Sequence, residues 1–252
     1  MISIKSEHEL VAMRRAGAIA ASALVAAGRV AAPGVTTKEL DTLIHDFIVA
    51  RGAYPTFLGY GGFPGSACIS VNDEVIHGIP GSRTLHDGDI VKIDVGATID
   101  GYVGDCANTF AVGNISDEAK RLIEVTRQSF YEGIKFAHAG NRISDISHAV
   151  QQYAETNGFS VVRSFVGHGV GAELHEDPEV PNFGKPGKGV RLCAGMTLAV
   201  EPMINAGTFP VNTLKNGWTV VTADGKLSAH YENSIAITDG EPQILTLASE
   251  DI

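Results

Sequence analysis

The sequence predicts an α+β fold in which helices cover one face of a largely antiparallel β-sheet. Two helix-like segments are followed by a series of strand-like segments, and this order occurs twice in the 252 residues. Weak internal similarity also relates the two occurrences. Runs of strands that follow runs of helices are typical of α+β proteins, whereas parallel sheets need regular alternation of strand and helix.

Four helices are predicted from apolar spacing and from capping residues. In the first, Leu10, Met13 and Gly17 begin a stripe of small and apolar residues at spacings of three and four, which favours close packing on one face. Hydroxyl residues followed by acids indicate the helix starts. The predicted helices span 6–31, 37–50, 116–137 and 143–157, with caps at Ser6, Thr36 or Thr37, Ser116 and Ser144.

Strands are predicted within 54–112 and through 159–248. In the clearest of them, Val91, Ile93 and Val95 lie on one face and Asp94 lies on the other. A tight turn at 99–101 then predicts a hairpin that pairs Asp94 with either Asp105 or Ala107. In both registers the carboxylates of Asp94 and Asp105 lie on the same face of the hairpin.

An internal repeat supports a division into two halves. The segment 85–94 matches 192–201 at an offset of 107 residues, which aligns Asp94 with Glu201. A second match at an offset of 106 aligns Gly34 with Gly140 and Gly52 with Gly158. We therefore expect a single domain, 1–252, made of two related halves, about 1–114 and 115–252, each of which contributes a pair of acids to a site between them.

Composition narrows the classes of partner. A net charge of −10 argues against a nucleic-acid-binding face and favours a neutral or cationic ligand. The three cysteines are widely spaced and form no CxxC pair, which predicts neither a disulfide framework nor a structural zinc site. No segment is expected to be long and apolar enough to span a bilayer. These features predict a cytoplasmic protein without a membrane partner or sequence-specific nucleic-acid binding.

Four acids and one histidine form the predicted metal-binding set. Cross-strand neighbours on one face lie roughly 5–8 Å apart, and like charges at that separation are destabilising unless a cation lies between them. Four carboxylates cancel the charge of two divalent ions, and paired ions can hold a shared hydroxide nucleophile. A ligand set without thiolates favours Co, Mn, Fe(II) or Zn over Cu(I). The alternative is that the acids are solvated surface groups. The set is Asp94, Asp105, His168, Glu201 and Glu232.

Three histidines are candidates for the chemistry. His168 lies between glycines, so that a ligand or metal can approach its imidazole closely, and His77 and His175 lie in segments that contain glycine or proline. Neutral imidazoles near a metal-bound peptide can donate a proton or polarise a carbonyl. The alternative for each is an ordinary loop residue.

Several short motifs occur along the chain: GFP at 62–64, CISVN at 68–72, VIHGIP at 75–80, IDVG at 93–96, GY at 101–102 followed by Asp105, GHGVG at 167–171, HEDP at 175–178, VEP at 200–202 and HYEN at 230–233. Together they resemble the motifs of the type I methionine aminopeptidases in their short bacterial form. The resemblance covers nearly the whole chain, and it implies a pita-bread fold with one catalytic domain. It also implies metal-dependent removal of the N-terminal methionine from nascent proteins and peptides when the second residue is small.

The resemblance implies a role for each residue of the site. Asp94 is expected to chelate one of two divalent metal ions, while Asp105 and Glu232 bridge both. His168 and Glu201 are expected to complete the other ion's ligands, with Glu201 also accepting the proton of the attacking water. His175 is expected to polarise the scissile carbonyl and stabilise the oxyanion. His77 is expected to contact the scissile amide or the following residue.

The resemblance also implies an apolar, aromatic pocket for methionine. Three of its residues depart from the commoner bacterial pattern: Phe57 replaces a cysteine, Phe63 a tyrosine and Leu174 a phenylalanine. None of the three is an expected metal ligand, so the departures bear on pocket shape. Trp218 has a second interpretation as a core aromatic residue. The expected pocket residues are Phe57, Tyr60, Phe63, Cys68, Leu174 and Trp218.

Two other functions stay open at this stage. One is another pita-bread peptidase, an Xaa-Pro aminopeptidase or a prolidase; the other is a non-catalytic binding protein of the same fold. Under the main interpretation the partner is the N-terminus of a peptide or nascent chain, the ribosome is a further candidate partner, and the enzyme is a monomer.

Overall fold

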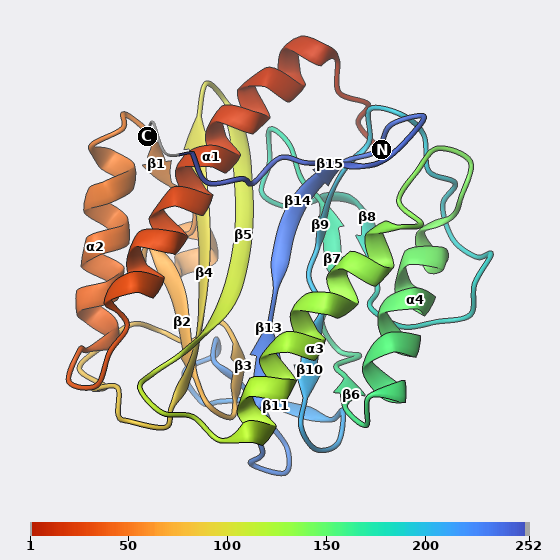
Figure 1. Ribbon diagram of the computed structural model, residues 1–252. Helices are drawn as coiled ribbons and strands as arrows, with labels where there is room; N and C mark the ends of the chain where they lie inside the picture. Colours follow the sequence, from red (N-terminus) through yellow and green to blue (C-terminus); the bar gives the residue numbers. More distant parts are fainter. Residues whose placement is uncertain (1, 250–252) are drawn as a thin grey trace.

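The helices lie on one face of a curved antiparallel sheet, as Figure 1 shows. The computed structural model describes residues 2–249; residue 1 and residues 250–252 of the expected domain lie outside the described residues. The helices are α1 (Glu7–Val30), α2 (Thr37–Val49), α3 (Asp117–Ile134) and α4 (Ile143–Thr156), and a short 3₁₀ turn spans Tyr60–Gly62. The predicted α+β class with a largely antiparallel sheet is confirmed.

The main sheet has nine strands within residues 2–249, and all of its pairings are antiparallel. Its principal path runs in the order β1-β4-β5-β14-β9-β7-β8, with β2 paired to β4 and β15 paired to β14. The strands are β1 (Tyr54–Pro55), β2 (Ala67–Val71), β4 (Ile90–Ile99), β5 (Tyr102–Ala111), β7 (Gly167–Gly169), β8 (Glu176–Val180), β9 (Thr197–Val200), β14 (Glu232–Ala236) and β15 (Gln243–Ile244).

In the described part of the chain, two three-stranded sheets accompany the main sheet. One has the order β13-β10-β6 and the other β11-β12-β3. Their strands are β3 (Glu74–Ile76), β6 (Ser160–Val161), β10 (Met203–Asn205), β11 (Val211–Thr213), β12 (Val220–Thr222) and β13 (Ser228–His230). They matter for the site because β3 and β13 each end at a histidine or directly before one.

The helix starts follow the predicted capping chemistry at three of four positions. Ser6, Thr36 and Ser116 each accept a backbone N–H of the first turn through the hydroxyl. The prediction of Ser144 is wrong, because α4 begins two residues earlier, after Arg142. There the side chain of Asp145 accepts the backbone N–H of Arg142, and this holds the first turn without a hydroxyl cap.

The sequence offsets of 106 and 107 residues reappear in the backbone. The helices α2 and α4 begin at Thr37 and Ile143, and the strands β1 and β6 begin at Tyr54 and Ser160. The segments before the two helices make matching β-bridges, Thr36 with Thr84 and Arg142 with Arg191. The paired glycines Gly34 and Gly140 have φ angles of 97° and 98°, a conformation that favours glycine. Equivalent local structures thus occur at equivalent places in the two halves.

Helix α1 is long and apolar enough, by length and composition, to cross a membrane, so the expectation that no segment meets this test is wrong. Alanine supplies much of its apolar character. In the structure 61% of its most apolar 18-residue window is buried, and the helix packs on β4 and β5 (Figure 1). The buried core helix of a soluble protein can meet the same criteria of length and composition as a membrane-spanning helix.

Each half of the sheet has its own apolar core beneath its helices. In the first half, Val91, Ile93 and Val95 of β4 pack with residues of α1 and α2. In the second half, Leu198 and Val200 of β9 pack with residues of α3 and α4. Because strand side chains alternate between faces, the residues between these apolar positions point to the opposite, concave side.

The contact between α1 and β5 depends on two glycines. A Cβ on Gly104 would lie 2.3 Å from the backbone nitrogen of Gly17 and 2.4 Å from its Cα atom. The helix backbone can therefore approach the strand only while position 104 has no side chain.

We expect Gly104→Ala to lower the free energy of unfolding of the apo protein by about 1–3 kcal/mol, because the helix has to move away from the sheet. Urea unfolding monitored by circular dichroism measures the change. Gly81→Ala is the matched control, since a Cβ there meets no atom within 4 Å, and it should change stability by less than about 1 kcal/mol. Equal unfolding midpoints for the two variants would contradict the close-packing argument.

Candidate metal centre and active site

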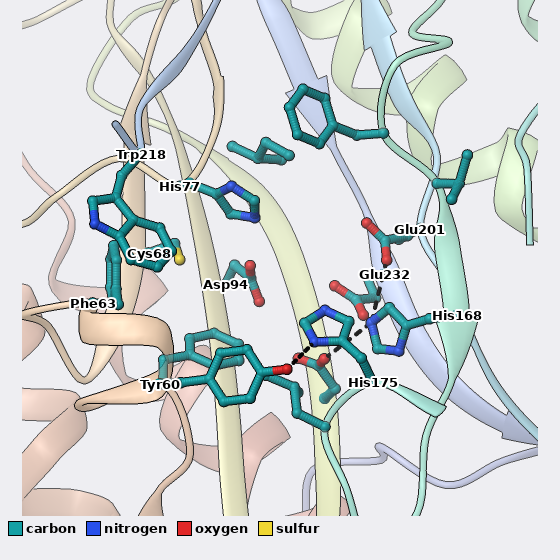
Figure 2. Close-up of a pocket in the computed structure, with 16 residues that line it drawn as sticks. Tyr60, Phe63, Cys68, His77, Asp94, His168, His175, Glu201, Trp218 and Glu232 are labelled. Atoms are coloured by element: carbon teal, nitrogen blue, oxygen red, sulfur yellow. Dashed lines mark hydrogen bonds and ion pairs between the residues drawn. The ribbon is translucent and has the colours of Figure 1, made fainter. Parts of the chain in front are cut away.

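The five residues of the predicted metal-binding set come from five neighbouring strands of the main sheet. The order β4-β5-β14-β9-β7 is continuous in the sheet, and each strand supplies one residue at its concave side. Figure 2 shows Asp94, His168, Glu201 and Glu232 around one space. The residues are Asp94 on β4, Asp105 on β5, Glu232 on β14, Glu201 directly after β9, and His168 on β7.

The hairpin register brings the first two acids together. Of the two registers that the sequence allowed, the structure has Asp94 opposite Ala107, with Asp105 opposite Gly96. Both carboxylates therefore lie on the face away from the helices, as neighbours along the diagonal of the hairpin. Asp105 is 3% exposed, so the alternative of solvated surface acids does not describe it.

Burial and mutual repulsion disfavour the charged forms of these acids. Desolvation raises the pKa of Asp105 to about 7. Desolvation, together with the charge of Asp105, raises the pKa of Asp94, Glu201 and Glu232 well above the ordinary range. One oxygen of Asp94, one of Asp105 and one of Glu232 is buried without a hydrogen-bond partner. Either protons or a cation must compensate such a cluster.

The proton position on His168 favours a cation. Its Nδ1 lies 2.8 Å from the carbonyl oxygen of Gly169, and because a carbonyl can only accept, Nδ1 carries the proton. Burial lowers the pKa of His168 to about 4, so the ring is neutral at pH 7. The lone pair of Nε2 then points toward two carboxylates, at 3.7 Å from Asp105 Oδ2 and 3.5 Å from Glu201 Oε1. This is the arrangement of a metal-ligating histidine whose other nitrogen is held by a carbonyl.

Among residues 2–249, two groups of three donors meet the geometric requirement for a divalent ion. The donors of Asp105, His168 and Glu232 lie within 4.8 Å of one another, and so do those of Asp94, His230 and Glu232. Glu232 belongs to both groups. The nitrogen and oxygen donors and the orphaned carboxylate oxygens therefore fit two adjacent ions.

His230 is a residue of this centre that the sequence analysis did not select. It is 2% exposed and stands two residues before Glu232. The signal was present in the HYEN motif, since residues two apart on an extended chain lie on the same face. The tyrosine between them packs on the other side, against Phe130.

His77 and His175 reach the centre from loops. His77 directly follows β3 and has a φ of 57°, an unusual backbone conformation for a residue other than glycine. Burial lowers its pKa to about 4, which keeps the ring neutral. His175 directly precedes β8; its ring centroid lies 4.3 Å from that of His168, and its Nδ1 lies 2.7 Å from Tyr60 Oη. Figure 2 shows both rings facing the acids.

A buried ion pair holds the loop that carries His175. Lys5 Nζ lies 2.5 Å from Glu176 Oε2, and the lysine side chain is only 2% exposed. The other carboxylate oxygen of Glu176 accepts the backbone N–H of Glu173, and the backbone of Lys5 donates to Gly195. The N-terminal segment thus stabilises the position of His175 from behind the loop.

A pocket of about 180 Å³ opens onto the acids. Its aromatic wall includes Phe63 and Trp218, which meet edge to face with ring centroids 5.2 Å apart. All six residues expected to form the methionine pocket line it, together with Asp94, Asp105, His168, Glu201, Glu232, His77 and His175. Ile76, Phe165 and Val166 also line it and were not predicted, because no motif distinguishes these apolar residues from core residues.

The protein-family comparison agrees with this geometry. The description "Metallopeptidase family M24" matches residues 11–239. The chain belongs to metallopeptidase family M24. Within that family, a methionine aminopeptidase of Clostridium perfringens is 58% identical over 247 residues, which are 98% of this chain and 99% of the relative. The resemblance to methionine aminopeptidases is therefore confirmed.

Solved structures similar to this chain differ in sequence identity and in TM-score. The crystal structure of methionine aminopeptidase from Rickettsia prowazekii superimposes with a TM-score of 0.97 at 43% identity, covering 98% of this chain and 100% of that one. An X-Pro aminopeptidase from Thermotoga maritima gives a TM-score of 0.75 at 21% identity and is matched over 63% of its length. The second likeness shows a common fold, and the expected pita-bread fold is confirmed.

We expect divalent metal binding to displace protons from the apo centre. Burial and mutual repulsion raise the pKa of all four carboxyl groups and so favour their protonated forms, whereas a metal ligand must be deprotonated. Binding of Mn(II) at pH 7 should therefore release at least one proton, and the apparent affinity should rise as the pH rises from 6.5 to 8. Calorimetric titration in buffers of different ionisation enthalpy measures the release.

Asp100→Asn, on the exposed turn of the same hairpin, is the control and should leave the release unchanged. Asp105→Asn should lower it. Binding without net proton release at pH 7 would mean that the carboxylates are already ionised in the apo protein.

Proposed function

We propose that the protein removes the N-terminal methionine from peptides and nascent chains when the second residue is small. The observation that carries this proposal is the continuity of the site: one pocket has an apolar aromatic wall at one end and the five-residue acidic centre at the other. A methionine side chain fits the wall, while its free amino end and scissile carbonyl lie toward the acids. The relatives named methionine aminopeptidase support the same activity.

We propose that two divalent ions, Co, Mn, Fe(II) or Zn, act in this centre. Asp94 would hold one ion, Asp105 and Glu232 both, and His168 and Glu201 the other. The neutral Nε2 of His168 and the orphaned carboxylate oxygens support this assignment. When bound, such ions lower the pKa of a water molecule and polarise a carbonyl group.

The chain's own groups would complete the reaction. Glu201 accepts the proton of the attacking water through its carboxylate and passes it to the departing amine. His175 donates a hydrogen bond to the carbonyl oxygen as negative charge develops on it. If the Tyr60 hydroxyl donates to Nδ1 of His175, the proton on that ring is at Nε2, which is then the donor. His77, on the opposite side in Figure 2, contacts the scissile amide or the following residue.

The pocket residues would select an unbranched side chain. Phe57, Phe63 and Leu174 are each less than 8% exposed, which restricts their movement. A flexible thioether adapts to such walls, whereas a β-branched side chain meets them near the backbone. We also propose that the 252-residue chain acts as one catalytic domain of two halves, as a cytoplasmic monomer. Nascent chains at the ribosome are its expected substrates.

We expect the metal-loaded protein to cleave Met-Ala-Ser and to leave an Xaa-Pro peptide such as Ala-Pro-Ser intact. Each peptide is incubated with the protein, with and without added Mn(II), and chromatography measures the free N-terminal amino acid that is released. Norleucine should replace methionine with lower kcat/KM, and leucine and lysine should be poor. Preferential cleavage of the Xaa-Pro peptide would favour a prolidase-like activity, and cleavage of neither peptide would favour a binding protein.

We expect Asp105→Asn to reduce kcat by more than the 10–100-fold that is typical when a group supporting a metal ligand is lost. The amide keeps the shape of the side chain and removes the charge that both ions require. Steady-state kinetics at saturating Mn(II) measure the effect. Asp100→Asn on the same hairpin should keep wild-type kcat, and wild-type kcat in Asp105→Asn would refute the bridging role.

We expect Trp218→Ala to raise KM for Met-Ala-Ser and to lower kcat/KM by about 10-fold or more, because a pocket wall is lost. The fold should remain intact, since Trp218 is only partly buried. Phe209→Ala is the control, because Phe209 is 41% exposed and lies outside the pocket. Normal kinetics combined with lowered stability would assign Trp218 to the core.

A further inference from the structure

His230 is held in place by both halves of the molecule. It ends β13, two residues before Glu232 begins β14. Its backbone N–H donates to Thr109 Oγ1 at 2.9 Å, and Thr109 Oγ1 donates in turn to its carbonyl oxygen at 2.8 Å. Because Thr109 lies on β5 of the first half, the position of the imidazole relative to Asp94 and Glu232 is determined by the sheet.

The imidazole of His230 is buried without a hydrogen bond. Neither Nδ1 nor Nε2 has a partner, and the residue is 2% exposed. Buried polar side-chain atoms are nearly always hydrogen-bonded or bound to an ion, so two orphaned nitrogens on one ring need an explanation. The ring faces the acids, with Nε2 at 3.7 Å from Glu232 Oε2 and 3.9 Å from Glu201 Oε2.

The distances from His230 Nε2 to the two carboxylates resemble those from His168 Nε2. The Nε2 atom of His168 lies 3.7 Å from Asp105 Oδ2 and 3.5 Å from Glu201 Oε1. Two donors that each lie about 2.1 Å from one ion are about 3.0 Å apart at right angles and about 4.2 Å apart when opposite. The distances around both rings are too long for hydrogen bonds and fall within this interval.

We propose that His230 is a second imidazole ligand of the metal centre, donating Nε2 to the ion that Asp94 and Glu232 hold. The donors of these three residues lie within 4.8 Å of one another. The proposal rests on the metal centre of the proposed function and adds a ligand to its five-residue set. Each of two ions then receives one imidazole, His168 on one side and His230 on the other.

This assignment has a consequence for metal choice. Without His230, the ion held by Asp94, Asp105 and Glu232 would have only oxygen ligands from the protein, a set that suits Mg(II) and Ca(II) as well as Mn(II). A nitrogen donor shifts the preference toward Co(II), Fe(II) and Zn(II). The ion on the Asp94 side is therefore expected to discriminate against Mg(II).

Paramagnetic proton NMR of the Co(II)-loaded protein tests the assignment directly. Each imidazole bound to Co(II) gives a strongly shifted, solvent-exchangeable N–H resonance. The wild-type protein with two ions bound should show two such resonances. His230→Gln should remove one of them and His168→Gln the other. His86→Gln is the matched control, because this side chain is 78% exposed, and it should keep both.

Calorimetric titration of the apo proteins with Co(II) and Mg(II) provides the second readout. His230→Gln should weaken binding of one Co(II) ion by about 10-fold or more, while Mg(II) binding changes little. Circular dichroism checks that the variant is folded. If it does not fold, the number of shifted resonances in the wild-type protein decides the question.

A single imidazole resonance in the fully loaded wild-type protein would overturn the proposal. Unchanged Co(II) affinity in His230→Gln would also overturn it, and would leave His230 as a hydrogen-bond donor to the carboxylates, a role that glutamine can fill. Failure of the wild-type protein to bind any divalent ion would instead overturn the metal centre itself. The two failures are therefore distinguishable.

Discussion

Repulsion among four clustered carboxylates is the constraint on which the rest of the structure depends. Asp94, Asp105, Glu201 and Glu232 share one space, and burial raises the pKa of each. Only protons or cations can balance such a cluster, and the scaffold must hold the groups together against their repulsion. Five adjacent strands provide that rigidity, since strand spacing is fixed by the backbone hydrogen bonds.

The centre lies at the seam between the two halves, where β5 pairs with β14. Side chains reinforce this seam on both sides of the acids. Ser234 Oγ accepts the backbone N–H of Asp105 and donates to its carbonyl oxygen, and Thr109 does the same for the backbone of His230. The segments on each side of this seam therefore hold backbone groups of the candidate centre on the other side, and the candidate ligands come from both sides.

The candidate metal ligands and the candidate substrate-contacting residues lie in different parts of the fold. The five predicted ligands lie on or directly after sheet strands, whereas His77, His175 and Trp218 lie in loops and Tyr60 lies in the short 3₁₀ turn. The X-Pro aminopeptidase of similar fold shares the strand framework at 21% identity. Loops can vary while a framework stays fixed, which explains why Phe57, Phe63 and Leu174 can depart from the commoner pattern without touching the metal ligands.

The sequence by itself determined the fold class and the hairpin. Period-two alternation around Asp94 and the capping residues Ser6, Thr36 and Ser116 are local signals, and local signals survive in any tertiary context. The motifs identified the family because they combine many positions. The choice between the Asp105 and Ala107 registers was not local, since both satisfy the same turn and the same alternation.

Only the tertiary structure decided which groups share the centre. Asp94 and Glu232 are distant in the chain, and their approach depends on the pairing of β5 with β14. The pocket residues Ile76 and Phe165 have no sequence signature, because an apolar side chain looks the same in a core and in a pocket wall. His230 was overlooked for a related reason. Its burial, its orphaned nitrogens and its distances to two carboxylates exist only once the strands are paired, because pairing removes water from the ring and brings the acids to it.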